Sequence, residues 1–253
     1  MTSIAAPERQ TGNPAFDPDR YPSETSVQPM TSRGTAWKAL VFTLILIAAA
    51  TGGWSSVSPD PGGLVVWPWW AWWMGLAAFI LAMITLSRPR LAAVTGLAYA
   101  GLEGWILGAI SAIYEVRFDG IVVQAVILTI AVLLATLVLY LVGAVRATRR
   151  MARGVTVAMG GVVLLYAFGW ILSLFGVDAA FWARPTSFGV FFSVVVIALA
   201  AFNLVLDFDM IERLGAAAAP KHMEWYAAFG LILTLVWLYL EVIRLIALNR
   251  SRQ

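Results

Sequence analysis

The sequence predicts an all-α membrane protein, a bundle of seven transmembrane helices, and three observations lead to this prediction. Hydrophobic residues make up 61% of the 253 residues and charged residues only 12%, whereas soluble domains are about half apolar and about a quarter charged. The mean hydropathy is +0.83. Seven apolar runs are each long enough, at about 20 residues, to cross the ~30 Å hydrocarbon core of a bilayer.

Residues 1–34 differ in composition from the rest of the chain. They are rich in Pro, Ser, Thr and charge and contain almost no apolar run, so they cannot bury enough surface to offset their ordering entropy. We therefore expect a disordered cytoplasmic tail over residues 1–34 and a seven-helix membrane domain over residues 35–249. The tail lacks the features of a signal peptide, and the first helix is expected to act as an uncleaved insertion signal.

Turn residues and charges separate the apolar runs. The connections read SPDPGG after the first run, SRPR after the second and RATRRMARG after the fourth, and such segments interrupt helices. The segment WPWWAWW at residues 67–73 is typical of an aromatic belt at the membrane interface, with a cation-binding aromatic cage as the alternative. The predicted helices are Trp37–Trp54, Val66–Ser87, Leu91–Tyr114, Gly120–Val145, Val155–Gly176, Pro185–Ile211 and Trp225–Leu248.

Lys and Arg orient the bundle, because cytoplasmic loops of membrane proteins carry an excess of both. With the N-terminus inside, 12 of 17 fall in cytoplasmic segments and the outer loops hold only Arg117 and Arg184. Seven spans place Arg244, Arg250 and Arg252 outside, against this rule, unless the last helix does not fully cross. We expect seven spans in a bacterial inner (plasma) membrane, with the N-terminus cytoplasmic.

Acidic residues inside the predicted spans are candidate functional residues, because an acid in a bilayer is costly and usually faces the bundle interior. On the sixth helix, Asp207 shares its face with small and polar residues such as Asn203, whereas the face of Asp209 is bulky and apolar. The two acids point about 160° apart. Asp207 is therefore predicted to face inward, and Asp209 to reach toward the lipid headgroups.

Two further acids lie on helix faces that can pack. Glu241 is followed at i+3 by Arg244, which favours an intrahelical ion pair without excluding a functional role. Glu103 borders a ladder of small residues that is typical of close helix packing, and is either a structural hydrogen-bonding acid or a proton or cation ligand. The ladder consists of Gly96, Ala100, Gly104, Gly108 and Ala112.

The composition also excludes several kinds of site. The chain has no cysteine and a single histidine, His222, which rules out disulfides, zinc–thiolate sites, iron–sulfur clusters and His-rich metal sites. It contains no P-loop, no H-E-x-x-H zinc motif and no G-x-G-D motif of intramembrane aspartyl proteases. We expect no enzymatic activity, no cofactor and no nucleic-acid partner. The expected partner is the lipid bilayer, with protons or a cation as the ligands expected for the acids inside the spans.

Four segments resemble the Bax inhibitor-1 family of YccA-like multi-pass membrane proteins, in its actinobacterial-type branch. They are YAGLEGWILGAISAIYE (99–115), GIVVQAV (120–126), LDFDMIE (206–212) and WYAAFGLILTLVWLYLEVIRLIAL (225–248), and the resemblance covers about residues 36–248. It implies a seven-helix fold with the last helix surrounded by the other six. It also implies a calcium leak gated by pH through one carboxylate on each of the last two helices.

The resemblance maps this carboxylate pair to Asp207, in the pattern x-D-F-x-x-I, and to Glu241, in LYLE, where many members have Asp. Two carboxylates in a low-dielectric environment do not easily both ionise, so we predict a pH-sensitive latch that opens a calcium path when both deprotonate. Asp207 and Glu241 would bind calcium weakly, because calcium prefers about six to eight oxygen ligands. Glu103 is assigned to the same cation path, with supporting roles for Asn203, Arg244 and Asp209.

Two questions stay open in the sequence. Glu241 lies 16 residues past Trp225, about 24 Å of helix, so it meets Asp207 only if residues near 220–230 lie outside or along the inner surface. The second question is functional, because some bacterial relatives interact with a membrane-bound protease. The alternative function is thus a non-channel regulatory partner of a membrane quality-control protease, with residues 1–34 as a handle for it or as a tail without a partner.

Overall fold

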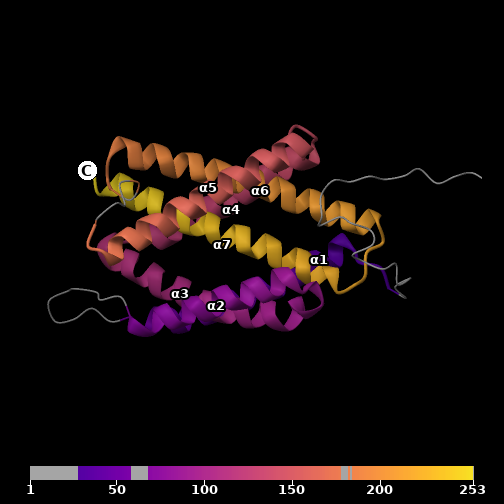
Figure 1. The fold of residues 1–253 in the computed structure, drawn as a ribbon, viewed down its shortest axis with the longest axis horizontal. Coiled ribbons are helices and arrows are strands. Elements are labelled where there is room, and N and C mark those ends of the chain that lie inside the picture. Colours follow the sequence, from indigo (N-terminus) through magenta and orange to yellow (C-terminus); the bar gives the residue numbers. More distant parts are fainter. Residues whose placement is uncertain (1–27, 58–67, 178–181, 183, 253) are drawn as a thin grey trace, which may run out of the picture.

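A computed structural model describes residues 28–57, 68–177, 182 and 184–252. In these ranges seven helices are long and apolar enough to cross a membrane, which confirms the predicted all-α bundle (Figure 1). A short 3-10 helix, η3 (Pro89–Leu91), links α2 to α3. The long helices are α1 (Ser32–Ser55), α2 (Trp69–Ser87), α3 (Ala92–Arg117), α4 (Ile121–Leu141), α5 (Arg149–Leu174), α6 (Ser187–Ala216) and α7 (Met223–Arg250).

Helix α1 begins earlier than the apolar run alone predicted. The side chain of Thr31 accepts a hydrogen bond from the backbone N–H of Gly34, which is the bond of a helix N-cap. The predicted boundary between tail and membrane domain at residue 34 therefore falls within the first turn of α1. Residues 1–27, and with them the prediction of disorder, lie outside the described residues.

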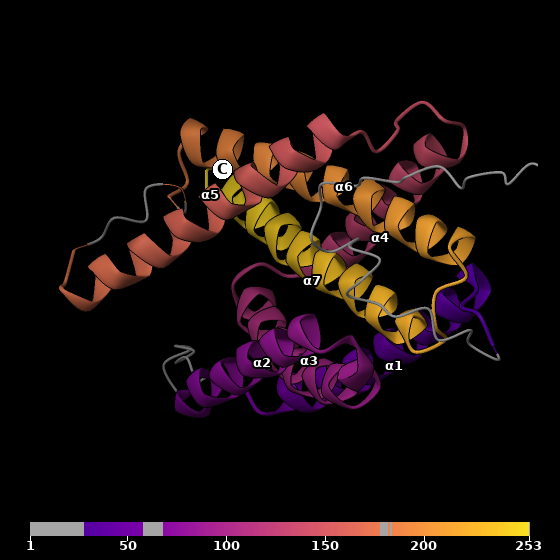
Figure 2. The same cartoon turned by 45° about the vertical axis from the view of Figure 1, so that its right-hand side comes forward.

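Helix α7 runs through the middle of the bundle. It packs against α6, α1, α4 and α3, and two views show it between a group of α4, α5 and α6 and a group of α1, α2 and α3 (Figures 1 and 2). Half of its most apolar stretch is buried, close to the 56% of the stretch that includes α3 and well above the 11% of α1 and α5. The predicted position of the last helix near the centre is therefore confirmed.

Two apolar clusters hold α7 from opposite sides. On one side Phe229 makes edge-on contacts with Phe42 of α1 and Tyr99 of α3, at centroid distances of 6.3 and 5.2 Å. On the other side Leu238 packs with Leu204 of α6 in a second buried cluster. Burial of a large apolar side chain contributes about 1.5–3 kcal/mol, so these contacts fix the position of α7.

The small-residue ladder of α3 packs against α1. A Cβ atom added to Gly104 or Gly108 would overlap backbone atoms of Leu46 and Ala50 in α1, so only glycine permits this approach. The neighbouring face of the helix is buried as well. The close packing predicted from the four-residue spacing is thus present between α3 and α1.

The last helix crosses the whole bundle. Its end lies beside the α3–α4 turn, where Arg250 donates a hydrogen bond to the Asp119 carbonyl at 2.7 Å. Its beginning lies beside the start of α1, where Glu224 pairs with Lys38. The start of α1 and the end of α7 are therefore at opposite ends of the bundle, and the alternative of an incomplete last span is not what the structure shows.

The tryptophan-rich start of α2 faces outward. Trp69, Trp72 and Trp73 are 76%, 60% and 68% exposed, while Trp70 packs edge-on against Trp105. Trp67 lies outside the described residues. Outward tryptophans at the start of a span fit an interfacial belt.

Candidate functional site

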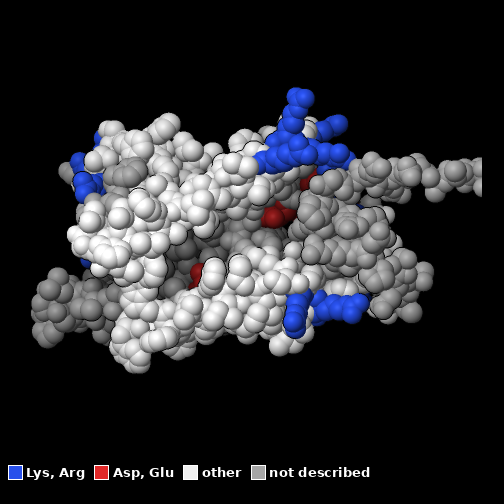
Figure 3. Space-filling view, viewed as in Figure 1, with Lys and Arg blue, Asp and Glu red and all other residues white. Residues whose placement is uncertain are grey.

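A cavity of about 900 Å³ lies along one face of α7. The α7 residues that line it run from Gly230 to Arg244 and recur at i, i+3, i+4 and i+7, so they form one stripe of the helix, about 21 Å long. Walls from α3, α5 and α6 complete the cavity. It exists because α5 packs mainly against α6 and buries just Val155 and Gly169. Figure 3 shows this hollow, with acidic side chains inside it.

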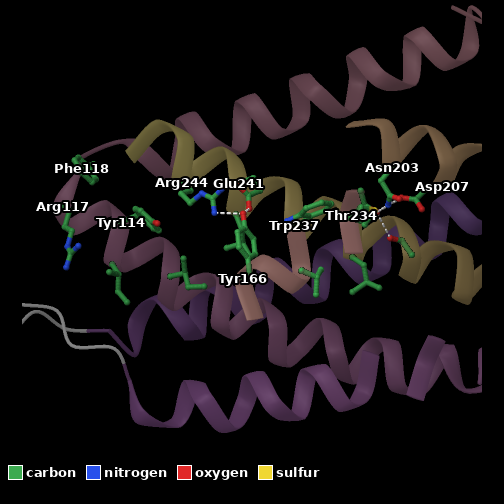
Figure 4. A pocket seen from close by; sticks show the side chains of 17 residues that line it. Tyr114, Arg117, Phe118, Tyr166, Asn203, Asp207, Thr234, Trp237, Glu241 and Arg244 are labelled. Atoms are coloured by element: carbon green, nitrogen blue, oxygen red, sulfur yellow. Dashed lines mark hydrogen bonds and ion pairs between the residues drawn. The ribbon is translucent and has the colours of Figure 1, made fainter. Parts of the chain in front are cut away.

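Asp207 lies near one end of the cavity and is 9% exposed. Its Oδ2 accepts a hydrogen bond from Thr234 Oγ1 of α7 at 2.6 Å. Asn203, one turn earlier on α6, donates to Thr234 Oγ1 at 2.7 Å and reaches Asp207 Oδ2 at 3.5 Å (Figure 4). Within the described part of the chain, the ion pairs involve other acids and leave Asp207 without a basic partner.

Glu241 lies farther along the same stripe and is 3% exposed. Arg244 Nη2 lies 2.6 Å from Glu241 Oε2, which is the predicted i+3 ion pair. Tyr166 of α5 donates to Glu241 Oε1 at 2.7 Å and accepts from Arg244 Nη1 at 2.7 Å. Arg244 also donates to Ser193 of α6 at 3.2 Å. The charge of Glu241 is therefore balanced inside a network that joins α5, α6 and α7.

The two carboxylates line one cavity, but they do not bond to each other. Among the hydrogen bonds of the described residues, those of Asp207 go to Thr234 and Asn203 and those of Glu241 go to α5 and to its own helix. Thr234 precedes Glu241 by two helical turns, about 10.5 Å of rise, and Trp237 stands between them (Figure 4). The direct latch predicted from the sequence is therefore not formed in this structure.

The remaining predicted residues lie apart from this cavity. Asp209 forms an ion pair with Arg213 at 2.7 Å, with side chains 23% and 54% exposed, so it points away from Asp207 as the helical geometry predicted. Glu212 accepts a hydrogen bond from Tyr140 of α4. Glu103 is partly buried on α3 but does not line the cavity. The structure thus brings Asp207, Glu241, Asn203 and Arg244 to one cavity, and leaves Asp209 and Glu103 outside it.

Sequence reasoning missed the partners that come from other helices. Tyr166 lies in the middle of a long apolar span, and no spacing rule connects it with Glu241, 75 residues later. Thr234 lies seven residues before Glu241, on the same face of one helix, but its contact with Asp207 depends on how α6 and α7 are aligned. The buried Glu224, 1% exposed, carries no local pattern that marks it as a partner of the start of α1.

The cavity offers few oxygen ligands. In the described ranges, no three His, Asp or Glu side chains lie close enough together to hold a metal ion. Asp207, Thr234 and Asn203 present a carboxylate, a hydroxyl and an amide, fewer than the six to eight oxygens, approximately, that calcium prefers. This set is too small for a tight calcium site.

The comparison with protein families places this chain in a known family. A model of the family described as Bax inhibitor 1 like matches residues 10–251. No curated protein and no solved structure matches. The matched range includes all seven long helices and both acids of the cavity, Asp207 and Glu241.

Proposed function

The chain belongs to the Bax inhibitor-1 family of multi-pass membrane proteins, and from this premise we propose that it conducts a pH-sensitive calcium leak along the cavity beside α7. One observation supports the proposal above the others. Asp207 faces the cavity as a buried carboxylate, and no described residue gives it a basic partner. A buried charge is costly unless something compensates it. A proton or a passing cation supplies that compensation.

The two acids have different roles in this proposal. Asp207 attracts the cation, with the oxygens of Thr234 and Asn203 as further ligands. Glu241 carries its own counter-ion, Arg244, and contributes when that pair opens. Protonation of Asp207 removes the attracting charge, so the leak decreases as the pH falls. In this proposal Asp207 and Glu241 respond to pH separately, each with its own partners, and no proton is shared between them.

We also propose an orientation with the N-terminus in the cytoplasm of a bacterial cell. The start of α1, the α2–α3 link, the α4–α5 link and the α6–α7 link lie at one end of the bundle (Figure 1). Lys and Arg cover more of that end than of the other end, where some are seen as well (Figure 3). An excess of basic residues is typical of the cytoplasmic side.

The test is calcium flux into dye-loaded liposomes that contain the purified protein. Asp207→Asn keeps the shape of the side chain and removes its charge, and we expect it to lower the flux and flatten its pH dependence. Asp209→Asn, two positions later on the opposite face, is the matched control and should behave as the wild type. A wild-type flux and pH profile in Asp207→Asn would exclude this path.

A further inference from the structure

The cavity ends, at the cytoplasmic end in the proposed orientation, in an apolar cluster. Asp207 and Gly230 are the last cavity residues of α6 and α7 at this end. One turn farther along the same faces come Met210 on α6 and Ala227 on α7, at spacings of i+3 and i−3. A Cβ atom added to Gly230 would lie 3.6 Å from Met210 Cε. The cluster is therefore continuous with the end of the cavity.

A short segment before α1, Gln28–Thr31, contributes the central side chain of this cluster. We call this segment the N-terminal arm. Met30 is 3% exposed and packs with Met223 and Ala227, with Met210, Ile211 and Leu214 around them. The arm thus fills the groove between α6 and α7 that adjoins the Asp207 end of the cavity.

Main-chain contacts join the arm to the α6–α7 turn. The N–H of Met30 donates to the Ala219 carbonyl at 2.8 Å, and Pro29 and Pro220 form an isolated antiparallel bridge. Lys221 donates to the Gln28 side chain at 2.6 Å. These contacts pair the arm with the α6–α7 turn, as in a very short β-ladder, and hold it in place.

A buried carboxylate anchors the other end of the arm. Glu224 accepts hydrogen bonds from the Thr31 N–H at 2.9 Å and from the Thr31 hydroxyl at 3.2 Å, and it pairs with Lys38. A Cβ atom at Gly34 would overlap this carboxylate, so a larger residue there would displace the Glu224 side chain from its place. The anchor fixes the start of α1 against the start of α7.

We propose that the N-terminal arm is a detachable seal at this end of the cavity. The other members of the cluster lie on or beside α6 and α7, whose positions are set by packing along their length, whereas Met30 precedes the first residue of α1. Docking of Met30 closes the groove between Asp207 and the end of the bundle, and its release opens the groove. The effect on calcium rests on the proposed function, but the covering of the groove does not.

A disulfide tests the seal directly, because the chain contains no cysteine. Residues paired across an antiparallel bridge have Cα atoms about 4.5–5.5 Å apart, within the range of about 4.4–6.8 Å that a disulfide needs. In the double variant Pro29→Cys/Pro220→Cys, we expect oxidation to lower calcium flux several-fold and a reductant to restore it. Equal flux in the oxidised and reduced protein would overturn the seal as a gate.

Shortening Met30 should have the opposite effect. Loss of a buried methionine side chain commonly weakens its docking by more than roughly tenfold, so Met30→Ala should raise the flux several-fold. Met30→Leu, which keeps the volume, should stay close to wild type, and so should Met83→Ala at an exposed methionine of α2. A flux in Met30→Ala equal to that in Met30→Leu would contradict the proposal.

A measurement without calcium separates the seal from the leak. Ala227 is buried in the cluster. The thiol of the variant Ala227→Cys should react with a charged thiol reagent about tenfold faster when Met30→Ala is added, in line with the lost docking. An unchanged rate would show that the arm does not cover the groove. A faster rate in a protein that shows no calcium flux at all would support the seal and reject the leak.

Discussion

Asp207 and Glu241 are both buried carboxylates on one cavity, but they differ in what balances their charge. Glu241 has Arg244 on its own helix and Tyr166 across the cavity, whereas Asp207 is held by the neutral side chains of Thr234 and Asn203. Burial is therefore not what distinguishes a structural acid from a candidate functional one. The difference is that Arg244 gives Glu241 a fixed counter-ion. Among the described residues Asp207 has no such counter-ion, so an exchangeable proton or cation can balance its charge.

The largest effect on stability is expected from Arg244→Gln. It would leave Glu241 buried without its cation, and breaking a buried ion pair from one side costs about 3–5 kcal/mol. The measurement is the free energy of unfolding in detergent. Adding Glu241→Gln should recover most of the loss, because an amide needs no counter-ion. Wild-type stability of Arg244→Gln would mean that Glu241 is balanced in another way.

An intermediate effect is expected from Thr234→Val, which removes the hydroxyl that donates to Asp207. A buried acceptor left without its donor costs about 1–3 kcal/mol. The matched control is Thr43→Val, whose hydroxyl bonds to the Ala39 carbonyl of its own helix and should change the unfolding free energy little. Equal losses in the two variants would show that Thr234 has no special role beside Asp207.

A smaller effect is expected from Tyr166→Phe. It removes one hydrogen bond to Glu241 and one from Arg244, but the ion pair remains, so the loss should be about 1 kcal/mol. The measurement is thermal unfolding of Tyr166→Phe and of Arg244→Gln under the same conditions. A loss as large as that of Arg244→Gln would assign the main support of Glu241 to Tyr166 and not to Arg244.

The smallest effect is expected from Asp209→Asn. Its partner Arg213 lies at i+4 with a side chain 54% exposed, and exposed pairs of this spacing contribute about 0.3–0.5 kcal/mol. Unfolding in low and high salt checks this, because the small loss should shrink as salt screens the pair. A loss of stability above that of Tyr166→Phe would mean that Asp209 behaves like a buried acid. The difference between Asp207 and Asp209 would then be smaller than the structure indicates.

Much of the architecture could be predicted from local pattern. Seven apolar runs predicted seven spans, the spacing of Gly104 and Gly108 predicted a close-packed face, and the 100° step of the α-helix separated Asp207 from Asp209. Each of these predictions depends on residues within one helix. The N-cap at Thr31 is also a local feature, but its role was hidden, because its second partner is Glu224, 193 residues away.

The pairing of the acids was beyond local pattern. The sequence predicted that Asp207 and Glu241 both lie on inner faces, but whether they meet depends on how far α6 and α7 are shifted along each other. The structure aligns Asp207 with Thr234, two turns short of Glu241. That alignment follows from the α6–α7 turn and from the packing of Leu204 with Leu238.

The sequence by itself determined the number of spans, the packing faces of the third, sixth and seventh helices and the identity of the acids, because hydropathy and helical periodicity act within one segment. Only the tertiary structure decided which partner each acid has, through the shift between α6 and α7 and through Tyr166 on α5. It also decided that the N-terminal arm lies at the Asp207 end of the cavity. Contacts between distant segments depend on the packing of all the helices at once, and no single segment of the sequence contains that information.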